Sequence, residues 1–541
     1  MNCGRQPGQN GQLIDVSEVY AEYIRPALEV AGMEVFGADD EQRPGAIRAD
    51  LFQELLLAER QAFSGSYRSW AQRMDVAHQK DCPGDLLVLA DEAPMRALHR
   101  EARRAAGKVL LKRRQYQLAL EQFELALAID ADDSFSREKK ALCLGRLGRF
   151  TEAREWLRQL IEGYPRDPAC WALLGHVEKE SWRAGWRQPG RTPAQMHAAA
   201  SHENRALGEA IEAYRQAFVA APADHHSGVK ALTLQVLRQH CRGESSQTMI
   251  EALIGGVRWS CLSARERDGK DYGAHASYAE LCLLIDPLPS VHQAFGNMVA
   301  AASGDCFALD STRQTLQLLR DIDFRPVETA TALSIVEGGI ERSRVPFEPR
   351  QVWLFSGHMI DAAGREPPRF PAAKEALAAA KIAEALDALG AGDGDLALAQ
   401  AASGGDLLFL EACQARGIRL QVMLPFESAE FIVRSVLPAS NGEHWRQRYL
   451  TLTNALAEQP RIMPAELGRL PKDVCGKAAN AFERCNLWLL YTALAWGIDK
   501  LRFVCLWNGG GGDGPGGTAH MYAEVKRRSG RVTWLDTRKL W

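Results

Sequence analysis

The sequence predicts two joined folds, an α-helical repeat solenoid in the middle of the chain and a doubly wound α/β domain at the C-terminal end. The first prediction rests on helix-type segments that recur with a regular spacing, as units that stack side by side into a solenoid do. The second rests on the alternation of buried-type strands with helices, with glycine following several strand ends. Such alternation is typical of a parallel sheet with helices on both faces.

Composition limits the classes of partner. The chain has 541 residues, with 65 Lys and Arg against 68 Asp and Glu, so the net charge is −3. This balance argues against nucleic acid and anionic membranes as partners, since both attract proteins with an excess of positive charge. No run of about 18 apolar residues is present, and the N-terminal segment Met1 to Gln12 is polar, which predicts a cytoplasmic protein with no membrane contact.

The cysteines and histidines do not show the spacing of a metal site. Twelve cysteines are scattered without a C-x-x-C pair, and thirteen histidines form no H-x-x-x-H pattern. Scattered thiols of this kind are typical of buried side chains in a reducing compartment. We therefore expect no metal site and no resident cofactor.

The solenoid prediction covers residues 96–345. Equivalent positions in the first two units are Tyr116 and Phe150, Ala119 and Ala153, Phe123 and Leu157, and Ala131 and Pro165. The next unit opens with Trp171-Ala172-Leu173-Leu174-Gly175 and carries an insertion around Trp182 to His202. The constant period, the small residues and the terminal proline indicate tetratricopeptide repeats, which bind a protein partner along a concave groove.

A basic stretch precedes the first complete repeat. Its members are Arg96, Arg100, Arg103, Arg104, Lys108, Lys112, Arg113 and Arg114. Two interpretations stay open: a solvated helix face beside acidic segments of the same chain, or a docking site for an acidic peptide or nucleotide. On the second interpretation an acidic partner would meet Arg113, Arg114 and Arg149.

The α/β domain is expected over residues 346–541. Strands are predicted at 351–355, 395–399, 419–426, 500–507 and 531–535, and helices at 373–389, 407–416, 428–436, 442–457, 476–496 and 519–528. Three glycine-marked turns follow strands in this pattern: Ser356-Gly357-His358, Ser403-Gly404-Gly405-Asp406, and the run from Gly512, Asp513 and Gly514 to Gly516, Gly517 and Thr518. Because parallel strands end at one edge of the sheet, these turns predict a crevice that holds a phosphate.

Individual residues in the turns allow two roles each. Asp406 and Asp513 either accept hydrogen bonds from ribose hydroxyls or cap helices, as aspartate often does. His358 and His520 are either acid/base groups or plain hydrogen-bonding residues at a strand end.

The C-terminal motifs resemble those of the SLOG superfamily. The likeness rests on Ser403-Gly404-Gly405-Asp406, the strand Val422-Met423-Leu424-Pro425-Phe426, and Pro515-Gly516-Gly517-Thr518 with Glu524 beyond. SLOG domains are Rossmann-like, are related to the DprA and LOG proteins, and bind nucleotides or nucleotide-derived signals. LOG enzymes carry P-G-G-x-G-T-x-x-E; here Thr518 directly follows Gly517 and Glu524 is displaced. The resemblance therefore implies phosphate binding, and the shortened motif departs from the catalytic pattern.

The repeat region resembles the sensor region (TRAFs-binding-domain-like) that bacterial proteins share with apoptosis-signal-regulating kinases. The matching stretches are Tyr164-Pro165-Arg166-Asp167-Pro168 with Trp171, residues 227–234, and Asp271-Tyr272. In that family a deoxyribosyltransferase-like Rossmannoid domain precedes the repeats. Residues 14–59 resemble it without its opening strand and its carboxylate motif, which implies a truncated, inactive remnant within residues 1–95.

Two functions from different classes follow. The first is a non-enzymatic signalling protein in which the C-terminal domain binds a nucleotide-derived signal and the repeats engage a protein partner, as the resemblance implies for bacterial stress or defence signalling. The alternative is a SLOG-type enzyme that cleaves a nucleotide N-glycosidic bond with Glu524 or His520 as the acid/base. Because no paired carboxylates or nucleophile–base spacing occur, the sequence favours the sensor, with no catalytic residue.

Overall fold

The computed structural model describes residues 6–7, 13–14, 69–94, 96–202, 205–243, 247–342, 347–471, 473–474, 477–478, 480–511 and 516–541. Trp70–Trp541 form one compact unit, and the segment before it is counted as a unit of its own. In the first segment, strands β1 (Gln6–Pro7) and β2 (Leu13–Ile14) pair in antiparallel fashion. The other residues of the predicted N-terminal remnant, up to position 68, lie outside the part of the chain that the structure describes.

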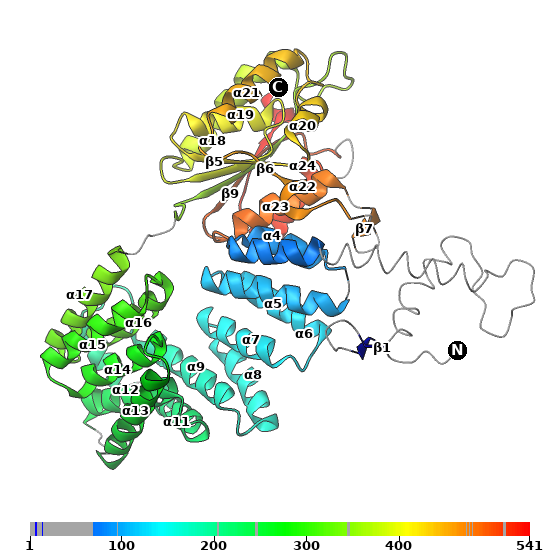
Figure 1. Cartoon of the computed structure of the whole chain (residues 1–541). Helices are drawn as coiled ribbons and strands as arrows, with labels where there is room; N and C mark the ends of the chain where they lie inside the picture. Colours follow the sequence, from blue (N-terminus) through cyan, green and yellow to red (C-terminus); the bar gives the residue numbers. More distant parts are fainter. Residues whose placement is uncertain are drawn as a thin grey trace, which may run out of the picture. The chain divides into compact units, whose positions relative to one another are not determined.

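The middle of the compact unit is an array of antiparallel helix pairs (Figure 1). Its helices are α5 (Arg96–Lys112), α6 (Tyr116–Ile129), α7 (Ser134–Arg146), α8 (Phe150–Gly163), α9 (Pro168–Trp186), α10 (Pro193–His202), α11 (Arg205–Ala220), α12 (His225–Arg242), α13 (Gln247–Arg267), α14 (Tyr272–Ile285), α15 (Leu288–Ala301), α16 (Cys306–Asp321) and α17 (Pro326–Arg342). The predicted insertion after Trp182 is the end of the long helix α9 together with the extra helix α10.

Small residues at the repeat period allow the paired helices to approach closely. Gly107, Ala141 and Gly175 occupy equivalent positions in successive units. A Cβ added at Gly107 would lie 2.6 Å from the ring of Phe123, and one added at Gly175 would lie 2.7 Å from the ring of Tyr214. In both of these units, a large ring of the second helix therefore packs directly against the backbone of the first.

Aspartates fix where several of the repeat helices begin. Asp167 accepts from Ala169 N at 2.9 Å, and Asp271 accepts from Ala274 N at 3.0 Å. Asp224 accepts from two backbone N–H groups at the start of α12. Each carboxylate satisfies donors that the first turn of a helix leaves unpaired.

The C-terminal part of the unit contains a six-stranded parallel sheet with the order β10-β9-β3-β4-β5-β6. Its strands are β3 (Val352–Gly357), β4 (Leu396–Ala399), β5 (Arg419–Leu424), β6 (Arg461–Ile462), β9 (Leu501–Trp507) and β10 (Val532–Asp536). The connecting elements are η2 (Ala372–Lys374), α18 (Glu375–Ala388), α19 (Gly405–Gln414), α20 (Ser428–Ser435), α21 (Gly442–Asn454), α22 (Met463–Leu467), α23 (Ala481–Leu494), α24 (Thr518–Arg528) and α25 (Thr537–Leu540). The predicted doubly wound fold agrees with this parallel sheet and its helices.

Two differences from the prediction concern the segment before β9. The helix expected at 476–496 begins only at Ala481, because 477–478 form strand β8 (Lys477–Ala478) paired with β7 (Asp473–Val474). The short strand β6 and the helix α22 that follows it were not predicted. A strand as short as β6 gives no periodic signal, so only its pairing with β5 defines it.

Alternate residues of the central strand β3 enter two different cores. Trp353 and Phe355 join a core with α18, α19 and α21, whereas Val352 and Leu354 join a core with α23 and α24. Figure 1 shows α18, α19 and α21 on one side of the sheet and α23 on the other. Both faces of the sheet are therefore covered, as a parallel sheet requires.

The second of these cores also continues into the first helices of the array. Residues 69–79 form a helix that is followed by α4 (Pro83–Asp91), and α4 packs against α23. The predicted N-terminal remnant, residues 1–95, includes these helices. In the structure Leu86, Leu89 and Trp488 share one core with Leu354. The helices before residue 95 therefore pack on the sheet domain.

Candidate functional site

A cavity of about 430 Å³ lies at the carboxyl ends of the parallel strands. Strand β3 is flanked by β4 on one side and by β9 on the other, so the chain changes direction across the sheet at β3. In open α/β sheets such a switch point leaves a crevice between the two diverging connections, and ligands bind there. The lining residues are Ser356, Gly357, His358, Met359, Arg369, Gln400, Ala402, Asp406, Ser435, Asn480, Phe482, Asn486, Trp507, Gly516, Gly517 and Thr518.

The structure brings the three predicted turns to this one place. The residues predicted for the site that line the cavity are Ser356, Gly357, His358, Asp406, Gly516, Gly517 and Thr518. The Oγ atom of Ser356 donates to Oγ1 of Thr518 at 3.3 Å, which links the end of β3 to the start of α24. Gly512, Asp513 and Gly514 lie outside the described residues, and their predicted role stays a prediction.

Ser403, Gly404 and Gly405 are not part of the cavity lining. The backbone N of Gly405 donates to the carbonyl oxygen of His358 at 3.0 Å. Gly404 has φ +92°, and a Cβ added there would lie 2.6 Å from the backbone N of Ile360. These glycines therefore allow the turn after β4 to cross the turn after β3 at close range, and their contribution to a ligand site is indirect.

His358 is held in its neutral form. Its Nε2 atom accepts from the backbone N of Asn508 at 3.1 Å, so the ring proton is on Nδ1. Burial, together with the charge of the nearby Arg369, lowers the pKa of His358 to about 4. At neutral pH His358 adds no positive charge to the cavity, which favours the hydrogen-bonding role over the acid/base role.

Asp406 forms hydrogen bonds to the backbone near the ends of β3 and β4. Its carboxylate accepts from the backbone N of Ala402 at 3.3 Å and also from the backbone of Gly357 and Gln400. Burial nevertheless raises the pKa of Asp406 to about 7, since removal from water penalises the charged form more than these bonds favour it. These bonds reach the end of β3 and the segment after β4, and none goes to the first turn of α19, so they support neither the ribose-binding role nor the capping role.

Three helices begin at the cavity. Asp406 lies in the first turn of α19, Phe482 in that of α23, and Thr518 in that of α24. Asn480 caps α23 through bonds to two backbone N–H groups, whereas no side chain caps α24. The positive ends of the three helix dipoles and the uncapped N–H groups of α24 therefore face one small volume, where they favour an anion.

The lining also contains polar side chains that were not predicted from the sequence. Asn486 contacts Gln400 at 2.8 Å through their side-chain amides and donates to the carbonyl oxygen of Gly516 at 2.6 Å. It lies inside the apolar helix α23, where a buried asparagine was the signal that could have revealed it. Arg369 supplies a cation to the lining and Trp507 an aromatic ring. Neither of them was predicted as a site residue.

The two residues named for the enzyme alternative do not line the cavity. Glu524 forms ion pairs with Arg527 at 2.6 Å and with Arg528 at 3.8 Å. His520 lies one turn earlier on α24, and its buried Nδ1 atom has no hydrogen-bond partner among the described residues. Neither side chain is positioned in the lining that a substrate would contact.

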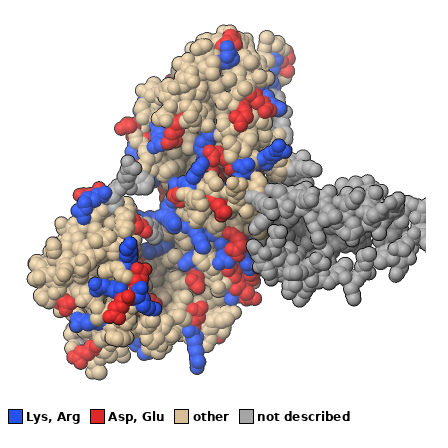
Figure 2. All heavy atoms as spheres, in the orientation of Figure 1, with Lys and Arg blue, Asp and Glu red and all other residues tan. Residues whose placement is uncertain are grey.

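The basic stretch before the repeats pairs largely within the chain. Arg103 contacts Asp91 at 2.7 Å, Arg113 contacts Asp81 at 2.9 Å, and Arg114 pairs with Asp310. Figure 2 likewise shows basic and acidic side chains interspersed on the face in view. These pairs favour the first interpretation over a docking role for Arg113 and Arg114, since their charges already have carboxylate partners.

A match to a family model supports the repeat assignment. Residues 115–235 match a family model described as Tetratricopeptide Repeats-Sensor. The match and the paired helices confirm that the chain contains tetratricopeptide repeats, the scaffold of a sensor or protein-interaction module. Among solved structures, the human IFIT1 dimer with PPP-AAAA matches at 15% identity and a TM-score of 0.19, over 54% of this chain and 78% of that one. No curated protein matches the sequence.

Two searches of the described residues bear on other kinds of site. Among these residues no helix has the length and apolar character needed to cross a membrane. The same part of the chain contains no group of three or more His, Cys, Asp or Glu side chains arranged to hold a metal ion.

Proposed function

We propose that this chain is a non-enzymatic sensor whose sheet binds a nucleotide-derived ligand and whose tetratricopeptide array engages a protein partner. Support for the ligand class comes from the cavity itself. Three helix N-termini and Arg369 favour phosphate, Trp507 offers a ring on which a base can stack, and Gln400 and Asn486 offer amide groups for hydrogen bonds. The SLOG-like order of the glycine turns points to the same ligand class.

The observation that carries the proposal is the position of helix α23. Its N-terminal turns line the cavity with Asn480, Phe482 and Asn486. Its opposite face holds α4 through Arg484, which pairs with Glu92 at 2.7 Å, and through Tyr491, which donates to Asp91 at 2.8 Å. Since α4 packs on α5, the first helix of the array, a ligand that orders α23 also acts on the helices that lead into the repeats.

The experiment is a titration of the full chain with nucleotides, cyclic nucleotides and NAD derivatives by calorimetry. Gly517 caps α24 with φ −76°, so both Ala and Asp fit its backbone. Gly517→Asp adds a negative charge where phosphate is expected, and we expect a loss of about 2–3 kcal/mol in binding free energy. Gly517→Ala is the matched control and should bind nearly as well as the natural protein.

Two results would count against the proposal. One is an absence of binding across the whole panel. The other is equal affinity of the Gly517→Asp and Gly517→Ala variants, which would separate the ligand from the start of α24. Hydrogen exchange of peptides from α4 in the presence of ligand tests the transmission step, and unchanged exchange there would limit the ligand's effect to the sheet.

A further inference from the structure

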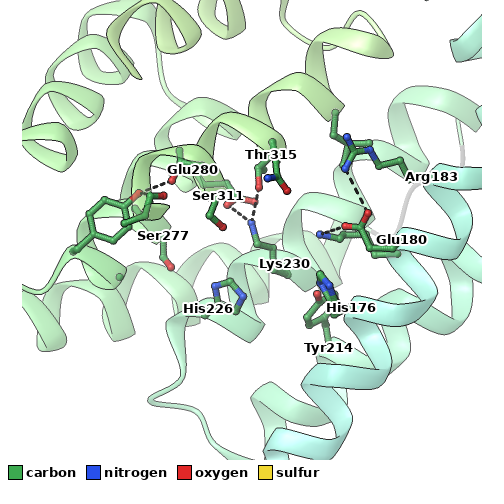
Figure 3. A pocket seen from close by; sticks show the side chains of 18 of the residues that line it. His176, Glu180, Arg183, Tyr214, His226, Lys230, Ser277, Glu280, Ser311 and Thr315 are labelled. Atoms are coloured by element: carbon green, nitrogen blue, oxygen red, sulfur yellow. Dashed lines mark hydrogen bonds and ion pairs between the residues drawn. The ribbon is translucent and has the colours of Figure 1, made fainter. Parts of the chain in front are cut away.

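A second cavity, of about 360 Å³, lies inside the repeat array. Figure 3 shows its side chains converging from several helices. The walls come from α7, α9, α12, α14 and α16, with Tyr214 from α11. It shares no lining residue with the cavity at the sheet. Its size is that of a small-molecule site.

The charged residues of this cavity are unequal in sign. Arg146, Lys179, Arg183 and Lys230 face Glu180 and Glu280. Two histidines, His176 and His226, also line it. Four cations against two carboxylates leave an excess of two positive charges, in a chain whose overall charge is negative.

Both carboxylates of the cavity already form ion pairs with cations of its wall. Glu280 pairs with Lys230 at 2.6 Å and also accepts from Thr233 at 2.6 Å. Glu180 is shared between Lys179 at 3.1 Å and Arg183 at 3.4 Å, as Figure 3 shows for Arg183. One carboxylate therefore serves two cations, and the other carboxylate that acts on Arg183, Asp321, already pairs with Arg187 at 2.7 Å.

Arg146 adds a cation that has no carboxylate partner among the described residues. Its guanidinium donates to the side-chain oxygen of Gln314, at the long distance of 3.4 Å. Arginine in the wall of a cavity normally pairs, because its planar group matches carboxylate and phosphate. The guanidinium at the end of α7 is thus available to an anion.

One ring nitrogen of a histidine in the wall also has no hydrogen-bond partner among the described residues. The Nε2 atom of His176 is buried and has no hydrogen-bond partner in the described part of the chain. Burial lowers the pKa of His176 well below its usual value, and the charges of Lys179 and Arg146 lower it further. Buried polar atoms normally have partners, so this atom indicates a group that the cavity accepts. Hydroxyl groups of Ser277, Ser311, Thr312 and Thr315 line the same space.

We propose that the array cavity binds a small phosphate-bearing anion, held by Arg146, Lys179 and Arg183 with His176 and the wall hydroxyls as further hydrogen-bond partners. Phosphate fits better than a single carboxylate, because it brings close to two negative charges at neutral pH and more acceptor oxygens. The ligand would contact successive repeats and α16 at once, so its binding would rigidify the array. This site lies beyond the proposed function, which places a ligand only at the sheet.

The test titrates the full chain with inorganic pyrophosphate and with ATP, and follows hydrogen exchange to locate the binding. We expect protection of peptides covering 173–183 and 308–318 with at least one probe. Binding of both probes would show that the phosphates suffice, and binding of ATP alone would show that the nucleoside is also recognised. In the Gly517→Asp variant this protection should persist, which separates this site from the one at the sheet.

A matched pair of variants tests the charge argument. Ser311 is exposed at the cavity wall, where Ser311→Glu adds a negative charge and Ser311→Gln adds the same bulk without it. We expect at least a tenfold loss of affinity for the Glu variant relative to the Gln variant. Arg146→Gln should also lose tenfold or more, whereas Arg166→Gln, an exposed arginine outside the cavity, should not.

Three outcomes would overturn the proposal. The first is no protection by either probe at low ionic strength. The second is equal affinity of the Glu and Gln variants at position 311 together with unchanged affinity of Arg146→Gln. The third is protection of the cavity peptides by an acidic peptide alone, which would make the cavity a peptide site.

Discussion

The indole N–H of Trp488 donates a hydrogen bond of 2.7 Å to the carboxylate of Asp85 across the contact between α23 and α4. The same carboxylate pairs with Arg461 at 2.6 Å, and Asp85 is almost completely buried. Both partners of Asp85 come from the far end of the sequence. The contact fixes the first helices of the compact unit to the sheet domain at the helix that also lines the candidate site.

Removing the charge of Asp85 should destabilise this contact. Asp85→Asn leaves the largely buried Arg461 with only Glu466, at 3.6 Å, as a carboxylate partner among the described residues. We expect a loss of about 3 kcal/mol in the free energy of unfolding, because an uncompensated buried charge is costly. Trp488→Phe loses one hydrogen bond and keeps the pair, and about 1 kcal/mol is expected. Urea denaturation followed by fluorescence and circular dichroism measures both. Equal effects would show that the ion pair adds nothing beyond the hydrogen bond.

A methyl group at Gly84 should force α4 away from α23. A Cβ at this position would lie 2.3 Å from Oγ1 and 2.8 Å from the backbone N of Thr492. Gly84→Ala should therefore lower the melting temperature by several degrees and increase hydrogen exchange in α4. Gly208→Ala is the control, since it lies within α11 with open space around it, and alanine there should stabilise the helix by up to about 1 kcal/mol. A neutral Gly84→Ala would mean that the helices can separate without cost.

Asp406 should make stability depend on pH. Burial raises its pKa to about 7, from an ordinary value near 4, so the folded state binds a proton that the unfolded state releases. Stability from this group is fully present at low pH and is lost as the pH rises from about 4 through 7. The loss amounts to at most about 4 kcal/mol. Denaturation of the natural protein and of Asp406→Asn at pH 5 and pH 8 isolates the effect, because other titrating groups cancel in the difference. Parallel pH curves for the two proteins would show that Asp406 is ionised throughout.

The ionisation of Asp406 should also change the affinity of the sheet site for its ligand. A protonated Asp406 is neutral, whereas its carboxylate repels a phosphate in the same cavity. Affinity of the sheet site for an anionic nucleotide should therefore fall as the pH rises through 7, and Asp406→Asn should remove that part of the dependence. Calorimetry at several pH values measures it. An affinity that rises with pH in the natural protein alone would contradict the expected sign.

A substitution of Glu524 distinguishes the proposed sensor function from the enzyme alternative. Its carboxylate pairs with Arg527 at 2.6 Å and lies outside the cavity lining. We expect no release of free base from nucleotides by the natural protein, and unchanged ligand affinity for Glu524→Gln. Chromatography of reaction mixtures detects the free base directly. Its appearance at a rate that falls in Glu524→Gln would reverse the assignment and establish the glycosidase alternative.

The sequence alone determined the elements whose signals are local. The constant repeat spacing that places Gly107, Ala141 and Gly175 in succession comes from helix pairs that repeat the same packing, so it is visible without any long-range information. The longer strands of the sheet were equally visible, because strands buried on both faces are continuous apolar runs. Glycine turns after those strands led to the carboxyl edge of the sheet.

Only the tertiary structure decided how distant residues meet. Asn486 reaches Gly516 and Gln400 because α23 packs under the sheet, and no spacing along the chain encodes that approach. Arg114 likewise pairs with Asp310 because the fold brings α16 close to the end of α5, so a residue predicted for docking belongs to an internal ion pair. Whether a charge is free depends on which carboxylate the fold brings within a few ångströms. Local patterns therefore determined the folds, and long-range packing decided which of their residues remain available to a ligand.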